Sequence, residues 1–207
     1  MPAEIVLIGG AAILANYGFR ESTYDIDAII NASEYMKDAI NIVGDELGLP
    51  NGWMNSDFVK TSSYSPKLIL YSKFYKRFGN IIDVRTVTGE YLIAMKLMSA
   101  RQYKNDISDV IGILIEEKRR GNDITHEIIR NAVVNLYGEW MCIPEKSRKF
   151  SEELFVGGKL EYLYKKYREN EIEARILLTE FKQEYKDVVN IDNVNEILEN
   201  LKKRKKE

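Results

Sequence analysis

The sequence predicts an α/β (α+β) protein in which a first part of alternating strands and helices precedes a helical region. Up to about position 120, short apolar runs that end at turn residues alternate with amphipathic stretches. Beyond Gly121, nearly every stretch has helical periodicity and mixed charge. The 207 residues and the hydrophobic fraction of 45% are sufficient for a substantial core.

The first predicted elements are a strand over 4–10, a helix over 11–18, a strand over 23–30 and a helix over 33–48. Both strands are apolar runs bounded by turn residues. The first helix is rich in alanine, and Gly18 ends it. The second helix has an N-cap within Asn31-Ala32-Ser33 and ends at Gly48, before Pro50.

The next predicted elements are a loop over 49–66, two strands within 67–87, and helices over 89–103 and 106–120. A turn near Gly79-Asn80 separates the two strands. Thr88 is the expected N-cap of the third helix, and Glu90 complements its positive first turn. We place a soft boundary near Gly121, which gives a domain over 1–120 and a helical region over 121–207.

Composition argues against several kinds of site. A net charge of −2 means that a nucleic-acid partner would need a local basic patch. Cys142 and His126 are each the only residue of their type, so we expect no internal disulfide, no Cys/His zinc site and no His-based triad. This cysteine usage fits a reducing cytoplasm. We expect no membrane partner, because the longest apolar run, over 110–115, is too short to span a bilayer.

Two carboxylates interrupt the apolar strand over 23–30. Side chains alternate along a strand, so Asp25 and Asp27 face one way while Ile26 faces the core, and the two acidic residues have Cα atoms roughly 6–7 Å apart. Like charges this close repel each other unless a cation accompanies them. Mg²⁺ prefers hard oxygen ligands, often carboxylates together with substrate phosphates. The pair therefore predicts a metal site for phosphoryl or nucleotidyl transfer.

The residues before this pair fit an approaching phosphate. Gly9 and Gly10 lack Cβ atoms, so a triphosphate can approach the backbone there, and the following helix offers free N–H groups. Arg20 can bind a phosphate bidentately, and Ser22 and Thr23 stand just before the carboxylates. Each feature alone is also typical of a turn, a solvated edge or a surface ion pair. The combination is much rarer than its parts.

The stretch GGAAILANYGFRESTYDID, over 9–27, resembles the signature of the DNA polymerase β-like nucleotidyltransferase superfamily. In that signature Gly-Gly or Gly-Ser, a short helix and Asp-x-Asp follow one another. The stretch is most similar to the branch related to the AbiEii abortive-infection toxins. The segments GWMNSDF, over 52–58, and EYLIAMKLMSARQYKNDISDVIGIL, over 90–114, also resemble segments of this branch. The resemblance covers about half of the chain and leaves the region after Gly121 unassigned.

The resemblance implies the nucleotidyltransferase fold, a small mixed sheet with flanking helices. Such a fold transfers a nucleoside monophosphate from a nucleoside triphosphate (NTP) to an acceptor, with Mg²⁺ or Mn²⁺. The resemblance implies that Asp25 and Asp27 are metal ligands. It also implies that Gly9 and Gly10 face the triphosphate, with Thr23 beside them. It also implies a toxin of a toxin–antitoxin or phage-defence system. The acceptor would then be tRNA or another RNA, and a cognate antitoxin protein would be a partner.

The superfamily usually has a third acidic residue on a later strand, and Asp83 is the expected candidate for catalysis and metal binding. Alternation places Asp83 and Arg85 on one face of their strand. The alternative is a plain ion pair between these two residues on an exposed face. Asp57 and Glu90 are weaker candidates. If none serves, a degenerate enzyme becomes the better interpretation.

Lys96 interrupts an otherwise apolar helix. It either extends to the surface or faces an anion in the cleft, and the family motif favours the cleft as a catalytic position. We assign Arg101 to the nucleotide in the same way, with an exposed arginine as the alternative. Asp106 and Asp109 share one helix face, where they either form its N-terminal turn or orient Lys96 or Arg101.

Three functional hypotheses remain open. The first is a metal-dependent nucleotidyltransferase that acts on tRNA or another RNA. The second keeps this chemistry and changes the acceptor to an antibiotic or another small hydroxyl compound. The third is a catalytically silent relative that binds nucleotide, RNA or a protein partner. Aromatic and basic residues interleave over 162–168, which suits RNA contact or an ordinary amphipathic helix.

Overall fold

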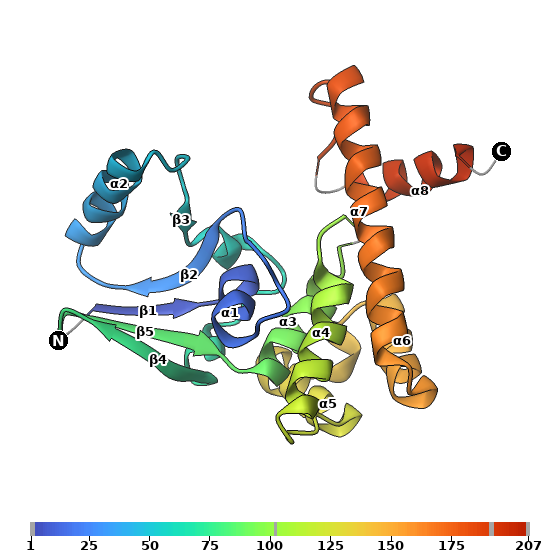
Figure 1. Ribbon diagram of the computed structural model, residues 1–207, viewed down its shortest axis with the longest axis horizontal. Coiled ribbons are helices and arrows are strands. Elements are labelled where there is room, and N and C mark those ends of the chain that lie inside the picture. The colour runs from blue at the N-terminus through green and yellow to red at the C-terminus, as the bar shows by residue number, and fades with distance from the viewer. Residues whose placement is uncertain (1–2, 102, 191–192, 206–207) are drawn as a thin grey trace.

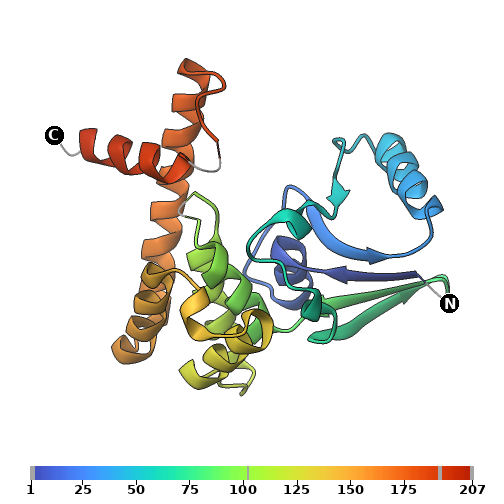
Figure 2. The same cartoon turned by 180° about the vertical axis from the view of Figure 1, so that it is seen from behind.

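The computed structural model describes residues 3–101, 103–190 and 193–205. Within these residues the chain forms a five-stranded mixed sheet and eight α-helices, which confirms the predicted α/β class. The sheet fills one half of the molecule, and most helices gather in the other half (Figure 1). Helix α2 lies beside the sheet, away from the other helices, in both views (Figure 2).

The elements follow one another along the chain with short connections. The strands are β1 (Ala3–Leu7), β2 (Ile26–Asn31), β3 (Met54–Asn55), β4 (Ser72–Phe78) and β5 (Ile82–Val87). The α-helices are α1 (Gly9–Asn16), α2 (Tyr35–Leu47), α3 (Gly89–Ser99), α4 (Asp106–Arg119), α5 (His126–Tyr137), α6 (Glu145–Gly157), α7 (Leu160–Glu184) and α8 (Val194–Arg204). The short 3-10 helices are η1 (Asp57–Lys60), η2 (Pro66–Ile69) and η3 (Trp140–Cys142).

The sheet has the strand order β3-β2-β1-β5-β4. Strand β1 pairs antiparallel with β2 and parallel with β5, so it lies at the centre. Leu7, at the end of β1, lies opposite Ala28 of β2, and the N–H of Ile8 donates to the carbonyl of Asp27 at 3.1 Å. This register places the turn after β1 directly beside the start of β2.

Strand β1 supplies buried side chains to both faces of the sheet, because alternate residues point to opposite faces. Val6 and the following Ile8 lie in the main core, whereas Ile5 lies on the other face in a smaller cluster with Ala28 and Val84. Helices α1, α3 and α4 complete the main core with Ile13, Leu92, Ile93, Leu97, Ile111 and Ile113. The main core thus anchors β1 and the helix that follows it.

The main core continues past the boundary that we predicted near Gly121. Helix α5 adds Ile129 and Val133 to it, and α6 adds Phe150 and Leu154. The boundary therefore marks a change in sequence character rather than a gap between two large cores. A small separate cluster joins α7 to α8 and consists of Ala174, Leu178, Val194 and Leu198.

One predicted turn is confirmed, and other local elements differ from the prediction for simple reasons. The hairpin turn falls at Gly79-Asn80 as predicted, and both residues have positive φ values of 53° and 56°. The third helix ends at Ser99 because Ala100 adopts a left-handed conformation with φ of 40°. Strand β3 falls within the predicted loop, since two residues carry too little pattern to be recognised. Within the described residues, no helix combines the length and apolar character needed to cross a membrane.

Candidate functional site

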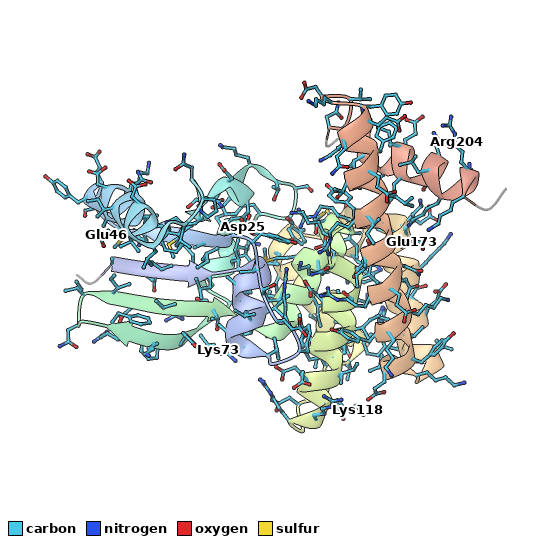
Figure 3. All side chains as sticks on the ribbon, turned by 45° about the horizontal axis from the view of Figure 1, so that its top comes forward. Asp25, Glu46, Lys73, Lys118, Glu173 and Arg204 are labelled. Carbon is cyan, nitrogen blue, oxygen red and sulfur yellow. The ribbon has the colours of Figure 1, made fainter. Side chains whose placement is uncertain are left out.

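A cleft of about 530 Å³ opens where the sheet meets the helices. Asp25 lies at this junction, between the sheet and the helical half of the molecule (Figure 3). Eight of the nine predicted site residues line the cleft, namely Gly9, Gly10, Arg20, Thr23, Asp25, Asp27, Lys96 and Arg101. Asp83 is not among the residues that line it.

Gly9 begins α1 and turns the chain from β1 toward the acidic pair. It has a φ of +53°, which side chains rarely tolerate, and a Cβ there would lie 3.3 Å from Oδ2 of Asp27. The first intrahelical bond runs from Ala12 N–H to the carbonyl of Ile8 at 3.1 Å, so the preceding N–H groups have no partner within the helix. The positive end of α1 therefore lies close to Asp27.

Gly10 is confined by two other cleft residues. A Cβ at this position would lie 2.6 Å from Oγ1 of Thr23 and 2.7 Å from Nη1 of Arg20. From the sequence, the expected reason for a glycine here is that a triphosphate can approach the backbone. The structure adds another reason, because two side chains of the protein already occupy this space.

Asp25 and Asp27 flank the first residue of β2. Asp25 is exposed and its carbonyl accepts a hydrogen bond from Oγ1 of Thr23 at 3.0 Å, whereas Asp27 is half-buried. Burial raises the pKa of Asp27, and the neighbouring Asp25 raises it further, against the opposing effect of Lys104 and Arg101. A cation between the two carboxylates would relieve both effects.

This donor set fits Mg²⁺ or Mn²⁺, because two carboxylates and substrate phosphates supply hard oxygen ligands. The described part of the chain holds no group of three or more His, Cys, Asp or Glu residues that could bind a metal ion. Asp57 is a further acidic residue that lines the cleft. It follows β3, in which Asn55 pairs with Asp27, and its Oδ1 accepts a hydrogen bond from Nζ of Lys60 at 3.0 Å.

Asp83 lies away from the acidic pair. It lies on β5 opposite Glu4, near the start of β1, whereas Gly9 and the cleft follow the end of β1. Arg77 of β4 donates to both of its carboxylate oxygens, and this hydrogen bonding lowers the pKa of Asp83. The alternative that we considered was an ion pair with Arg85, but the partner is Arg77. Alternation showed which face Asp83 takes and could not show the strand register.

Lys96 is buried and faces the cleft rather than the surface. Its Nζ lies 2.8 Å from Oδ1 of Asp106 and 2.9 Å from Oδ2 of Asp109. Burial alone would lower the pKa of Lys96, but these two carboxylates outweigh it and raise the pKa above its ordinary value. Lys96 is therefore charged at neutral pH.

The same two carboxylates hold two more cations beside Lys96. Nε of Arg101 lies 2.9 Å from Oδ2 of Asp106, and Nη1 of Arg20 lies 3.2 Å from Oδ2 of Asp109. Burial would raise the pKa of Asp106, but Lys96 and Arg101 outweigh it and hold the pKa well below its usual range. The first turn of α4 thus gathers three cations at the cleft.

Lys104 and Asn105, in the connection between α3 and α4, also line the cleft and were not predicted. Both lie within the stretch over 90–114, so the motif indicated the segment without these side chains. Glu171 of α7 was not predicted either, although its buried carboxyl group binds the first turn of α4. A single glutamate in an amphipathic helix rich in charged residues carries no signal of this kind.

An acidic pair beside a helix N-terminus and a cluster of three cations is the arrangement expected of a protein that binds nucleotide phosphates. Residues 1–135 match the family model "Nucleotidyltransferase of unknown function (DUF6036)", and the chain belongs to this family. The match confirms the nucleotidyltransferase resemblance, while the AbiEii-related branch stays a prediction. No curated protein and no solved structure matches the chain.

Proposed function

We propose that the protein transfers a nucleoside monophosphate from an NTP to an acceptor with the help of a divalent metal ion. One observation carries this proposal. Asp25 and Asp27 lie in one cleft with the N-terminus of α1 and the charged Lys96. Carboxylates suit a divalent cation, whereas a helix N-terminus and a lysine suit phosphates.

In this proposal Asp25 and Asp27 hold Mg²⁺ or Mn²⁺, which when bound neutralises phosphate charge and polarises the reacting oxygens. The N–H groups at Gly9 and Gly10 bind the triphosphate, with Thr23 beside them. Lys96 adds positive charge at the phosphates or at the acceptor. Arg20 and Arg101 each keep N–H donors beyond those that bind α4, and these donors can hold further phosphate oxygens.

We propose RNA, including the 3′ end of tRNA, as the acceptor. The surface of α7 supports this choice, because Lys165 and Lys166 are exposed and the Tyr162 side chain is 63% exposed for stacking on a base. A role as a toxin with a cognate antitoxin rests on the resemblance to the AbiEii-related branch alone. An antibiotic or another small hydroxyl compound is the rival acceptor.

The test is incubation of the protein with each labelled NTP, Mg²⁺ and total cell RNA or protein. We expect labelled RNA with the wild type and none with Asp25→Asn or Asp27→Asn, while circular dichroism shows the same fold for all three. Asp83→Asn should retain transfer, because Asp83 lies outside the cleft. Full metal-dependent transfer by the Asp25 and Asp27 variants would refute the assignment of these residues.

A second candidate function is nucleotide binding without transfer. One observation favours it, since no third metal-binding side chain joins Asp25 and Asp27 within the described residues. The same incubation, repeated with small hydroxyl compounds as acceptors and accompanied by calorimetry with Mg²⁺ and NTP, separates the two candidates. A silent relative would bind Mg²⁺ and NTP in calorimetry and label neither RNA, protein nor small hydroxyl compounds.

A further inference from the structure

A buried acid of α7, Glu171, binds the first turn of α4. Oε1 of Glu171 accepts hydrogen bonds from the N–H groups of Ile107 at 2.9 Å and Ser108 at 3.2 Å, and its Oε2 lies 2.5 Å from Oγ of Ser108. The first N–H groups of a helix have no partner within it, so Glu171 supplies an N-terminal cap from another element. Only 3% of Glu171 is exposed to solvent.

A second residue of α7 holds the residue that precedes this turn. Nη2 of Arg175 donates to Oδ1 of Asn105 at 2.6 Å, and Asn105 is the N-cap residue of α4 and lines the cleft. Glu171 and Arg175 are four residues apart, so they lie on one face of α7. Figure 3 shows α7, marked by Glu173, alongside α4. We call Glu171 and Arg175 the α7 clamp.

The turn that the α7 clamp holds is the same turn that gathers the cations of the cleft. Asp106 and Asp109 bind Lys96, Arg101 and Arg20 on the side that faces the cleft. Oδ2 of Asp106 also accepts the N–H of Arg101 at 3.0 Å. A shift of this turn would therefore move all three cations together.

We propose that Glu171 and Arg175 are positioning residues, which place the cations of the cleft against nucleotide phosphates by fixing the first turn of α4. This inference rests on the proposed function. It gives the helical region a part in the site, because both clamp residues lie beyond the matched residues 1–135.

The charges around the turn are consistent with this arrangement. Three acidic side chains, those of Asp106, Asp109 and Glu171, surround the positive N-terminus of α4. Lys96, Arg101 and Arg20 form ion pairs with the two aspartates, and Arg175 binds Asn105 beside them. Lys96 and Arg101 line the cleft together with Asp27. Removal of Glu171 would leave two amides without their partner and free the turn to move.

The test uses the full-length chain and four variants. Glu171→Ala removes the cap, and Glu171→Gln keeps an oxygen for the two amides. Arg175→Met removes the bond to Asn105 and disturbs the fold less than the loss of a buried cap. Glu169→Ala is the matched control, because Glu169 is an exposed glutamate on the same helix.

Three properties are measured well below the unfolding temperature of each variant. Hydrogen exchange at Ile107 and Ser108 needs no substrate and reports the turn itself. Mn²⁺ binding reports the acidic pair. Binding of the labelled NTPs in the presence of Mn²⁺ reports the cations.

In Glu171→Ala we expect faster exchange and NTP affinity weaker by roughly tenfold or more, a size typical of losing an outer-shell partner. Mn²⁺ affinity should change less than about twofold, because Asp25 and Asp27 are untouched, whereas a general loss of structure would weaken both affinities together. Glu171→Gln should show exchange and NTP affinity close to those of the wild type. Arg175→Met should change exchange and NTP affinity in the same direction as Glu171→Ala. Glu169→Ala should match the wild type.

Unchanged exchange and NTP affinity in Glu171→Ala would overturn the inference, as would equal losses of Mn²⁺ and NTP affinity. If Glu171→Ala does not fold, Arg175→Met decides by the same criteria. A wild-type protein that binds neither Mn²⁺ nor NTP contradicts the proposed function itself. A wild type that binds both, beside a Glu171→Ala variant that binds both equally well, contradicts the clamp alone.

Discussion

At Gly10, the addition of a single methyl group should weaken NTP binding in the cleft. An alanine Cβ would lie 2.7 Å from Nη1 of Arg20, which itself lies 3.2 Å from Oδ2 of Asp109. We expect Gly10→Ala to push Arg20 away from α4 and to weaken NTP binding, measured by calorimetry, by roughly tenfold or more. Gly18→Ala is the matched control, because nothing lies within 4 Å of a Cβ there.

Equal NTP affinity in Gly10→Ala and the wild type would show that neither Arg20 nor the phosphates depend on this space. Gly10→Val extends the test, since the alanine Cβ already meets both Thr23 and Arg20 and the larger side chain must displace both of them further. A graded loss from alanine to valine is expected if packing against these two side chains sets the effect. An equal loss in both variants would instead indicate strain in the turn.

The contact between α7 and α4 should make stability depend on pH. Burial raises the pKa of Glu171 from 4.5 to about 7, even though hydrogen bonds from Ser108 and Ile107 lower it. Because the folded pKa exceeds the unfolded one, the folded state holds a proton that the unfolded state releases. The stabilisation that protonated Glu171 contributes to the folded state is thus complete below pH 4.5 and is lost as pH rises through about 7. A shift of this size corresponds to about 3 kcal/mol at most.

Glu171→Gln isolates this effect, because glutamine does not titrate and still offers an oxygen to the two amides. We expect the free energy of unfolding, measured in urea from pH 5 to 8, to fall with pH more steeply in the wild type than in this variant. The two proteins should differ most at pH 8, where the variant should be the more stable one. Parallel curves would show that Glu171 keeps an ordinary pKa.

Local chemistry made several elements predictable from the sequence. Gly79-Asn80 can adopt the positive φ values of a tight hairpin, and Gly9 can make the turn from β1 into α1. These glycines and the apolar runs beside them specify the turns without knowledge of the rest of the fold. Strand pairing lies outside such local patterns. The register that sets Asp83 opposite Glu4 depends on contacts between distant segments, which a single sequence does not display.

The cleft itself was predictable to the extent that its residues lie in motifs. The pair Asp25 and Asp27 and the lysine Lys96 each interrupt an apolar run, and such interruptions are visible in the sequence. The way in which Asp106 and Asp109 share three cations depends on how α1, α3 and α4 pack together. Glu171 reaches this cluster only because α7 folds back along α4, so no pattern near it could reveal the contact.

The extent of the main core predicts which fragments of the chain will fold. A chain that ends at Gly138 loses Ile143, Phe150 and Leu154, which are buried in the same core as β1 and α3. Each such side chain contributes roughly 1.5–3 kcal/mol, and a typical domain is stable by only about 5–15 kcal/mol. We therefore expect no cooperative thermal unfolding by circular dichroism for this fragment, although it contains the whole family match over 1–135.

A chain that ends at Glu184 should behave differently. It loses α8, whose buried Val194 and Leu198 belong to the small cluster with Ala174 and Leu178 rather than to the main core. It keeps the α7 clamp and every cleft residue. We expect this chain to unfold cooperatively at a lower temperature than the full chain, because the small cluster becomes exposed. We expect its NTP affinity to stay within about twofold of the full chain, because no outer-shell partner of the cleft is removed. Cooperative unfolding of the Gly138 fragment, or failure of the Glu184 fragment to fold, would show that the helical region relates to the sheet in another way.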